Sequence, residues 1–142
     1  MQMVTAEKIA AVMALVPVPY SFSALDELVR SGLPKSALKL SVAHVGRTVD
    51  ERKSILHGII PEATFKRRTT RLSPAESKRA ERLARIFATT NYVWEDGEEA
   101  RDFLHAAHPL LENRTPLDIS MSELGARRVE ELLWNLFYGL PV

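Results

Sequence analysis

One stretch, Leu72-Ser73-Pro74-Ala75-Glu76, constrains the fold of this chain more than any other. Ser73 and Glu76 can exchange side-chain to backbone hydrogen bonds, the capping box that begins a helix. Pro74 takes the first helical position, where its missing N–H costs nothing. The apolar residues that follow recur at the spacing of one helix face: Ala80, Leu83, Ala84 and Phe87. The stretch therefore predicts a long helix from Ser73 to about Asn91.

Similar start and stop signals divide the rest of the chain into helices. The expected helices lie between Ser21 or Ser23 and Gly32, Pro34 and Gly46, Thr48 or Asp50 and Gly58, Pro61 and Arg68, Gly97 and Ala107, and Ser122 and Gly139. No stretch of five residues alternates β-branched or aromatic with polar residues, and no Asn-Gly or Asp-Gly turn occurs. No internal repeat or low-complexity linker is present. The sequence therefore predicts an all-α protein.

Charge is distributed unevenly along the 142 residues, although the net charge is only +1. Residues 1–72 carry 11 Lys and Arg against 6 Asp and Glu, whereas residues 73–142 carry 8 against 12. A basic front half (+5) and an acidic back half (−4) indicate two different partners, the first of them a polyanion. The alternative is uneven scatter on an ordinary surface. We place the boundary between two regions, 1–72 and 73–142, where this composition changes.

Several classes of protein are disfavoured by what the sequence lacks. Without cysteine there is no disulfide or thiolate site, which favours a reducing compartment and hence the cytoplasm. No apolar stretch reaches the eighteen residues that span a membrane. No phosphate-binding glycine loop or Ser-His-Asp arrangement is evident, so we expect neither catalysis nor a cofactor. His105 and His108 have a spacing compatible with a metal, but ordinary polar positions explain them better.

The acidic run between residues 95 and 102 is likewise not predicted to bind a metal. Its carboxylates are Glu95, Asp96, Glu98, Glu99 and Asp102. They lack the spacing and the glycine of a calcium loop, so a solvated helix start accounts for them better than a bound cation.

The segment from Gly58 to Arg68 has the pattern of a helix-turn-helix motif, in which the second helix enters the major groove of DNA. The candidate DNA-binding residues are Thr64, Lys66, Arg67, Arg68 and Arg71. They supply one hydroxyl and four cations, and the arginine fork suits both phosphate and guanine. The alternative is a solvated basic helix end. Because such proteins commonly bind paired half-sites, we expect at least a homodimer.

Two apolar segments are candidate contact surfaces. Near the start, the apolar residues that could support a dimer contact are Val12, Leu15, Val16 and Phe22. The other segment lies at the end of the last predicted helix and consists of Tyr138, Gly139, Leu140, Pro141 and Val142. The family resemblance given below makes it a candidate toxin-binding segment. This tail either folds back on its own core or inserts into a partner.

Taken together, the ordered motifs resemble the Xre/MbcA/ParS type of antitoxin. The resemblance covers about residues 30–142 and depends on 64–68, 72–77, 79–85, 99–104, 109–111 and 114–118, with Gly125, Val129, Leu132, Tyr138 and Gly139. Two positions depart from the pattern: Phe103 replaces a tryptophan, and Glu112-Asn113 replaces a Gly-Gly-like step. Asn113 tolerates a left-handed backbone, so a similar turn can form.

The resemblance implies a type II toxin–antitoxin system. It implies an Xre-like helix-turn-helix half that binds operator DNA and represses its own operon. It also implies a small helical C-terminal half that wraps a RES-domain toxin, an enzyme that degrades NAD, and obstructs its active site. The alternatives are a free-standing regulator whose C-terminal half dimerises or senses a ligand, and a small helical adaptor.

Overall fold

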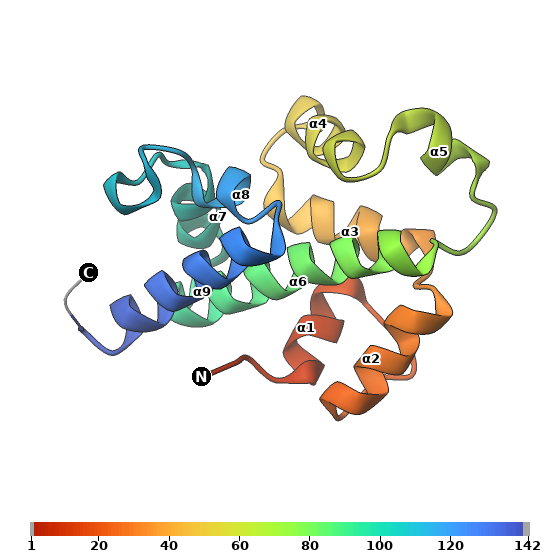
Figure 1. Cartoon of the computed structure of the whole chain (residues 1–142), viewed down its shortest axis with the longest axis horizontal. Helices are drawn as coiled ribbons and strands as arrows, with labels where there is room; N and C mark the ends of the chain where they lie inside the picture. Colours follow the sequence, from red (N-terminus) through yellow and green to blue (C-terminus); the bar gives the residue numbers. More distant parts are fainter. Residues whose placement is uncertain (1, 141–142) are drawn as a thin grey trace.

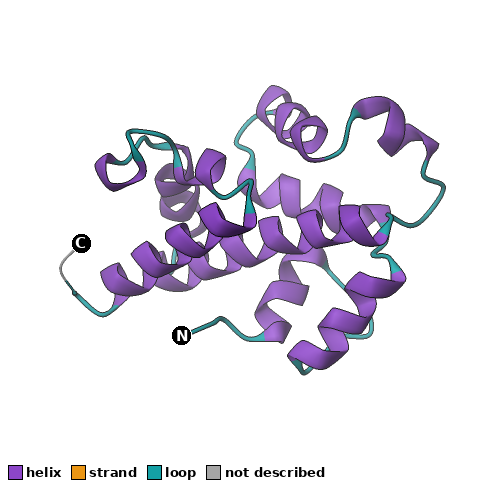
Figure 2. Cartoon of the chain, viewed as in Figure 1, coloured by secondary structure: helices purple, strands orange, loops and turns teal. Residues whose placement is uncertain are grey.

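The computed structural model describes residues 2–140, and the regular structure in that range is helical (Figures 1 and 2). The elements are α1 (Ala6–Met13), α2 (Phe22–Ser31), α3 (Lys35–Val45), α4 (Val49–Ile59), α5 (Glu62–Arg67), α6 (Pro74–Trp94), α7 (Gly97–His105), a 3-10 helix (Pro109–Leu111), α8 (Pro116–Ile119) and α9 (Glu123–Phe137). The predicted all-α class is confirmed. None of these helices is long and apolar enough to cross a membrane.

The long helix α6 forms the axis of the molecule, with α3 and α9 along it, α1 and α2 on one side and α4 and α5 on the other (Figure 1). Its start is the predicted capping box: Ser73 Oγ accepts from the Glu76 N–H, and Glu76 Oε1 accepts from the Ser73 N–H. The helix continues one turn beyond the expected end to Trp94, where Glu95 adopts a left-handed conformation. Both halves of the chain therefore pack on one helix.

Short polar side chains begin the other helices largely where the sequence predicts. The residues whose side chains accept a first-turn N–H are Ser21, Thr48, Asp96, Thr115 and Ser122. Helix α4 runs through Gly58 and ends at Ile59, because Gly58 lies on the exposed side while Ile59 is buried. Helix α7 ends at His105, two residues earlier than expected.

A single hydrophobic core joins all parts of the described chain. The α6 stripe predicted from the sequence is buried in it, and so are Val129, Leu132 and Leu133 of α9. Val12 and Leu15 also lie in this core, each 7% exposed. They are therefore unavailable to a second copy of the chain, which corrects that part of the expected dimer contact. Val16 and Phe22 remain exposed.

Ser77, the residue after the capping box, connects α6 to the backbone just before α3. The buried Ser77 Oγ accepts a hydrogen bond from the Leu33 backbone N–H at 2.8 Å, across 44 positions of sequence. Since a buried N–H without a partner is costly, this hydroxyl satisfies the backbone just before α3.

Candidate functional surfaces

Helices α4 and α5 are joined by the short turn at Ile60 and Pro61, as expected of a helix-turn-helix motif. Phe65 is buried on the inner side of α5, whereas Lys66 and Arg67 are exposed. Thr64 is half-buried, and its Oγ1 accepts a hydrogen bond from Arg67 Nη2 at 3.4 Å. The buried ring of Phe65 thus fixes which side of α5 faces solvent, and three of the five candidate DNA-binding residues lie on this helix.

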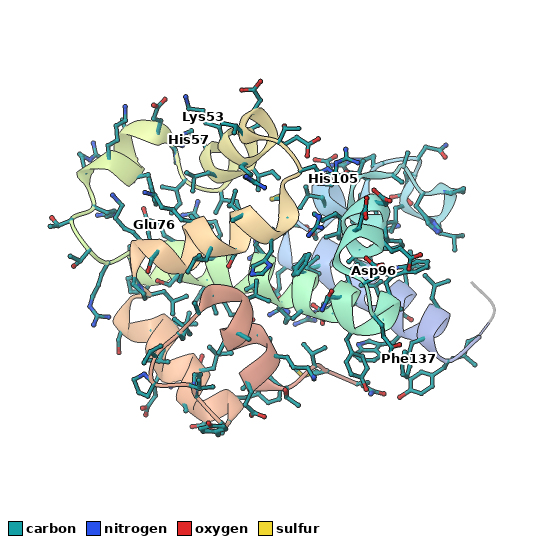
Figure 3. The ribbon with its side chains drawn as sticks, turned by 180° about the vertical axis from the view of Figure 1, so that it is seen from behind. Lys53, His57, Glu76, Asp96, His105 and Phe137 are labelled. Carbon is teal, nitrogen blue, oxygen red and sulfur yellow. The ribbon has the colours of Figure 1, made fainter. Side chains whose placement is uncertain are left out.

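Lys66 has a carboxylate partner one turn earlier in α5. Its Nζ lies 3.1 Å from Glu62 Oε1, with both side chains more than half exposed. Hydrogen bonding and charge from Lys66, together with the nearby cations His57 and Lys53 of α4, lower the pKa of Glu62. Lys53 and His57 lie on α4 (Figure 3). Neither residue is among those predicted from the sequence to bind DNA, although their spacing of four places them on one helix face.

Arg68 lies just beyond α5 and holds the helix-turn-helix against α6. Its Nε and Nη2 donate to the two carboxylate oxygens of Glu76 at 2.9 and 3.0 Å. The pKa of Glu76 falls to about 2, chiefly because of this hydrogen bond, with a further contribution from Ser73 and against the opposing effect of burial. Glu76 is only 4% exposed and lies at the start of α6 (Figure 3). The Arg68 guanidinium is therefore paired with a buried carboxylate of the same chain, although the side chain itself is 37% exposed.

Arg71 is also tied to the chain's own backbone. Its Nη1 donates to the Gly32 carbonyl at 2.7 Å. On either side of it the backbone N–H of Lys35 donates to Thr70 O at 2.9 Å and that of Leu72 donates to Leu33 O at 2.8 Å. The segment after α5 is thus fastened to the start of α3, and Arg71 takes part in that fastening.

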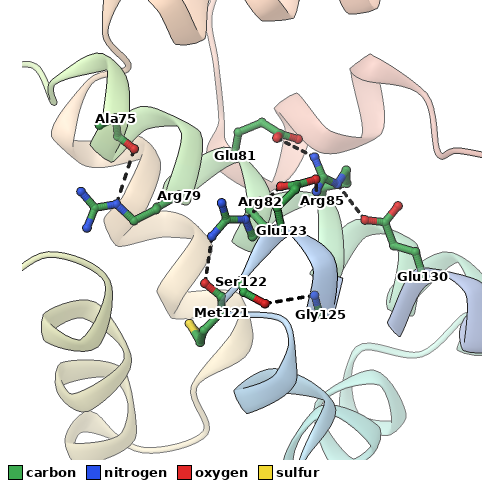
Figure 4. Close-up of polar contacts among 10 residues, drawn as sticks. All are labelled: Ala75, Arg79, Glu81, Arg82, Arg85, Met121, Ser122, Glu123, Gly125 and Glu130. Carbon is green, nitrogen blue, oxygen red and sulfur yellow. Dashed lines mark hydrogen bonds and ion pairs between the residues drawn. The ribbon is translucent and has the colours of Figure 1, made fainter. Parts of the chain in front are cut away.

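Arginines on one side of α6 connect the two parts of the chain, and Figure 4 shows the contacts of Arg82 and Arg85 with the start of α9. Arg79 Nη1 donates to the Ile59 carbonyl at the end of α4 at 2.8 Å. Arg82 Nη1 donates to the Met121 carbonyl, just before α9, at 2.9 Å. These two hydrogen bonds bring the turn of the helix-turn-helix and the start of α9 to neighbouring positions of the same helix.

One turn further along, Arg85 lies among three carboxylates (Figure 4). It contacts Glu81 at 2.9 Å, Glu123 at 3.0 Å and Glu130 at 2.8 Å, and its side chain is 14% exposed. Burial raises the pKa of Glu81, against the charge of Arg85. The pKa of Arg85 is raised because Glu81, Glu130 and Glu123 outweigh the effect of its own burial. This network fastens α9 to α6.

The C-terminal end of α9 presents aromatic side chains that stack on one another. Trp134 is buried and lies 5.5 Å from Tyr92 and 5.6 Å from Phe137 between ring centres. The ring centres of Phe137 and Tyr138 lie 5.1 Å apart, and these residues are 41% and 54% exposed, respectively. The Tyr138 hydroxyl donates to Gln2 Oε1. Figure 3 shows Phe137 at the edge of the molecule.

The candidate toxin-binding segment is only partly described. Gly139 has a φ of 67°, and Leu140 is 53% exposed. The Leu140 N–H donates to Asn135 O at 2.8 Å, a bond that closes the end of α9. The predicted residues Pro141 and Val142 lie outside the described part. Leu140, the last described residue, therefore remains more than half exposed beside the aromatic cluster.

The histidines and carboxylates considered for a metal have other roles. His105 Nε2 donates to the Val45 carbonyl at 2.9 Å, and His108 Nδ1 accepts from the Leu110 N–H at 3.1 Å. Asp96 caps α7 (Figure 3). Within residues 2–140 no group of three such side chains is arranged to hold a metal ion. His105, His108 and Asp96 instead make hydrogen bonds to the backbone.

The fold and surfaces together define a helix-turn-helix protein with a second helical domain. Residues 24–85 match the model of the antitoxin Xre-like helix-turn-helix domain. Residues 90–139 match the model of the antitoxin Xre/MbcA/ParS C-terminal toxin-binding domain. The search of curated proteins finds no significant match. The chain belongs to the Xre/MbcA/ParS type of antitoxin, and the resemblance found in the sequence is confirmed.

Proposed function

We propose that this antitoxin neutralises a RES-domain toxin that degrades NAD and that it binds operator DNA to repress its own operon. The observation that carries the proposal is the placement of two exposed surfaces on one fold. Lys66 and Arg67 form a basic surface on α5, while Phe137 and Tyr138 form an aromatic surface at the end of α9. Cations suit a phosphate backbone, and aromatic side chains are enriched where proteins bind proteins.

On the DNA side, Thr64, Lys66 and Arg67 contact the duplex, while Arg68 and Arg71 position α5 through their internal partners. Each phosphate contact contributes about −0.9 to the slope of log affinity against log salt. For duplex from the region upstream of its own gene, Arg67→Ala is expected to reduce the magnitude of this slope by about 1 per half-site. Binding that does not change with salt contradicts the proposal. As DNA is the partner, the protein acts in the cytoplasm.

The DNA-binding unit is at least a homodimer, because one short recognition helix spans only a few base pairs. The exposed Val16 and Phe22 are available for the contact between copies. Light scattering at micromolar concentration, with and without DNA, tests this proposal. A mass of 16.0 kDa under both conditions contradicts it.

On the toxin side, the segment from Tyr138 to Val142 obstructs the NAD pocket, and the proposed contacts are Tyr138, Gly139, Leu140, Pro141 and Val142. Fully burying one Leu side chain contributes about 1.5–3 kcal/mol. Leu140 is more than half exposed in the free chain, so this contribution is available on binding.

Truncation after Tyr138 tests the role of this segment. The shortened chain should still fold, bind DNA and copurify with the toxin, because the core and α5 are untouched. Coexpressed with the toxin-sized reading frame next to its gene, it should let NAD fall and growth stop, whereas the full chain prevents both. Full protection by the truncated chain assigns inhibition to the wider surface. If the full chain does not copurify with the product of the neighbouring reading frame, and if that product expressed alone does not lower NAD, the result favours a free-standing regulator.

A further inference from the structure

The solvent-facing side of α5 carries an acceptor and a donor side by side. Glu62 and Lys66 are one helical turn apart and paired at 3.1 Å. Ala63 and Arg67 are also exposed, whereas Phe65 is buried on the opposite side. On this six-residue helix Ala63 and Arg67 lie opposite Phe65, and the exposed Glu62–Lys66 pair lies beside them, so a groove that receives α5 from that side can meet the pair as one unit.

A carboxylate at this position requires an explanation if α5 binds DNA. Lys66 of α5, which is paired with Glu62 at 3.1 Å, and Lys53 of α4 supply positive charge around Glu62 and favour its ionised form. An ionised carboxylate only accepts hydrogen bonds and is repelled by phosphate. Glu62 therefore opposes DNA binding at every sequence unless the DNA places a hydrogen-bond donor against it.

The major-groove edge of one base pair offers that arrangement. Guanine presents the acceptors N7 and O6, and next to them cytosine presents the N4–H donor. We propose that the Glu62–Lys66 pair reads a single G·C base pair of the operator, with Lys66 donating to guanine and Glu62 accepting from cytosine. This inference rests on the proposed binding of operator DNA and goes beyond it by assigning one base preference to two residues.

Two of the other base pairs, A·T and C·G, present mismatched groups in the same frame. An A·T pair places the adenine N6–H donor against the Lys66 ammonium and the thymine O4 acceptor against the Glu62 carboxylate. An inverted C·G pair exchanges donor and acceptor and so opposes both side chains. We therefore expect the preferred G·C pair to bind about 10- to 100-fold more tightly than A·T or C·G at that position. A T·A pair also presents an acceptor, thymine O4, to Lys66 and a donor, adenine N6–H, to Glu62, so it should be discriminated less, through the methyl group that replaces guanine N7.

The experiment uses the full chain and a library of randomised duplex DNA. The selected site is then changed one base pair at a time, and the affinity of each duplex is measured for wild type, Glu62→Gln, Glu62→Ala and Lys66→Arg. Both Glu62 variants should lose most of the preference at one base pair only, with other positions unchanged. Lys66→Arg should keep guanine there, because arginine also donates to N7 and O6.

Asp26→Asn is the matched control. It removes the exposed i,i+4 pair of Asp26 with Arg30, at 2.9 Å, on α2, which lies on the other side of α6 from α5 (Figure 1). It should change no base preference. Thermal unfolding should show that all variants keep the fold, since Glu62 and Asp26 are both exposed.

The outcomes separate this inference from the proposed function. Loss of one base preference in the Glu62 variants supports the inference. Tighter binding of Glu62→Gln to every duplex, with the preferences unchanged, overturns it, because Glu62 then only repels phosphate. Failure of the wild-type chain to bind any duplex overturns the proposed function itself.

Discussion

Replacing Glu76 by glutamine removes one charge from the contact that holds α5 against α6. The drop in the pKa of Glu76 from 4.5 to about 2 corresponds to about 3 kcal/mol of stability at neutral pH. Arg68 is 37% exposed, so solvent screens part of this contribution. Glutamine also keeps the shape and can still accept a hydrogen bond. We therefore expect Glu76→Gln to lower the free energy of unfolding by about 1–2 kcal/mol at pH 7.

The pH dependence gives a second test of the same contact. The unfolded carboxyl takes up its proton as the pH falls through about 4.5, whereas the folded one does so only near 2. The stabilisation is thus complete above about pH 5 and is lost between there and about pH 2. The difference between wild type and Glu76→Gln should shrink as the pH is lowered from 7 to 4, in urea unfolding followed by circular dichroism.

Asp118→Asn provides the control for this prediction. It removes the i,i+4 pair of Asp118 with Arg114, in which the two side chains are 57% and 55% exposed. Such an exposed pair contributes at most about 0.5 kcal/mol. If Glu76→Gln costs no more than Asp118→Asn, or if its cost is the same at pH 7 and pH 4, the Arg68–Glu76 contact does not stabilise the fold as argued.

Two further substitutions test the packing of α9 on the rest of the molecule, both by urea unfolding. Gly125→Ala should cost at least about 2 kcal/mol although alanine favours helix, because a Cβ would lie 1.8 Å from the Ile119 carbonyl oxygen; Gly58→Ala, with open space around it, should be neutral or stabilising. Arg85→Ala should cost about 3–5 kcal/mol by leaving its buried carboxylates unpaired. The Arg85→Ala variant should regain stability as the pH falls towards 5, because burial raises the pKa of Glu81 and that carboxyl binds a proton more readily when folded than when unfolded. Equal stability of Gly125→Ala and Gly58→Ala, or a cost below 1 kcal/mol for Arg85→Ala, contradicts this description.

Local signals in the sequence predict where the helices begin. Ser73, Thr48 and Ser122 cap helices because their hydroxyls reach an N–H only three residues away, a distance that the sequence itself specifies. The periodic stripe of α6 likewise specifies which side is buried. Helix ends are less well specified: α6 passes Asn91 because residues 92–94 continue to pack on neighbouring side chains.

The roles of the arginines could not be predicted in the same way. Arg68 meets Glu76 across eight positions, Arg71 meets Gly32 across 39 and Arg85 meets Glu130 across 45. No periodicity relates such pairs, because chain folding brings them together. As a result, the sequence predicts a row of cations suited to DNA, while in the structure Arg68 and Arg71 of that row bind partners within the chain.

The division of the chain into a basic and an acidic half does not show which charges face solvent, because several arginines of the acidic half are bound within the protein. Arg79, Arg82 and Arg85 lie in the acidic half, yet their guanidinium groups bind the carbonyls of Ile59 and Met121 and nearby carboxylates. They connect the end of α4 and the start of α9 through one rigid helix. A change at the aromatic end of α9 can therefore reach the helix-turn-helix through α6 and these hydrogen bonds, whereas the contact of His105 with the Val45 carbonyl links α7 to α3 by a separate route. Because α6 is packed on both sides, breaking these hydrogen bonds disturbs less of the core than shifting the helix does.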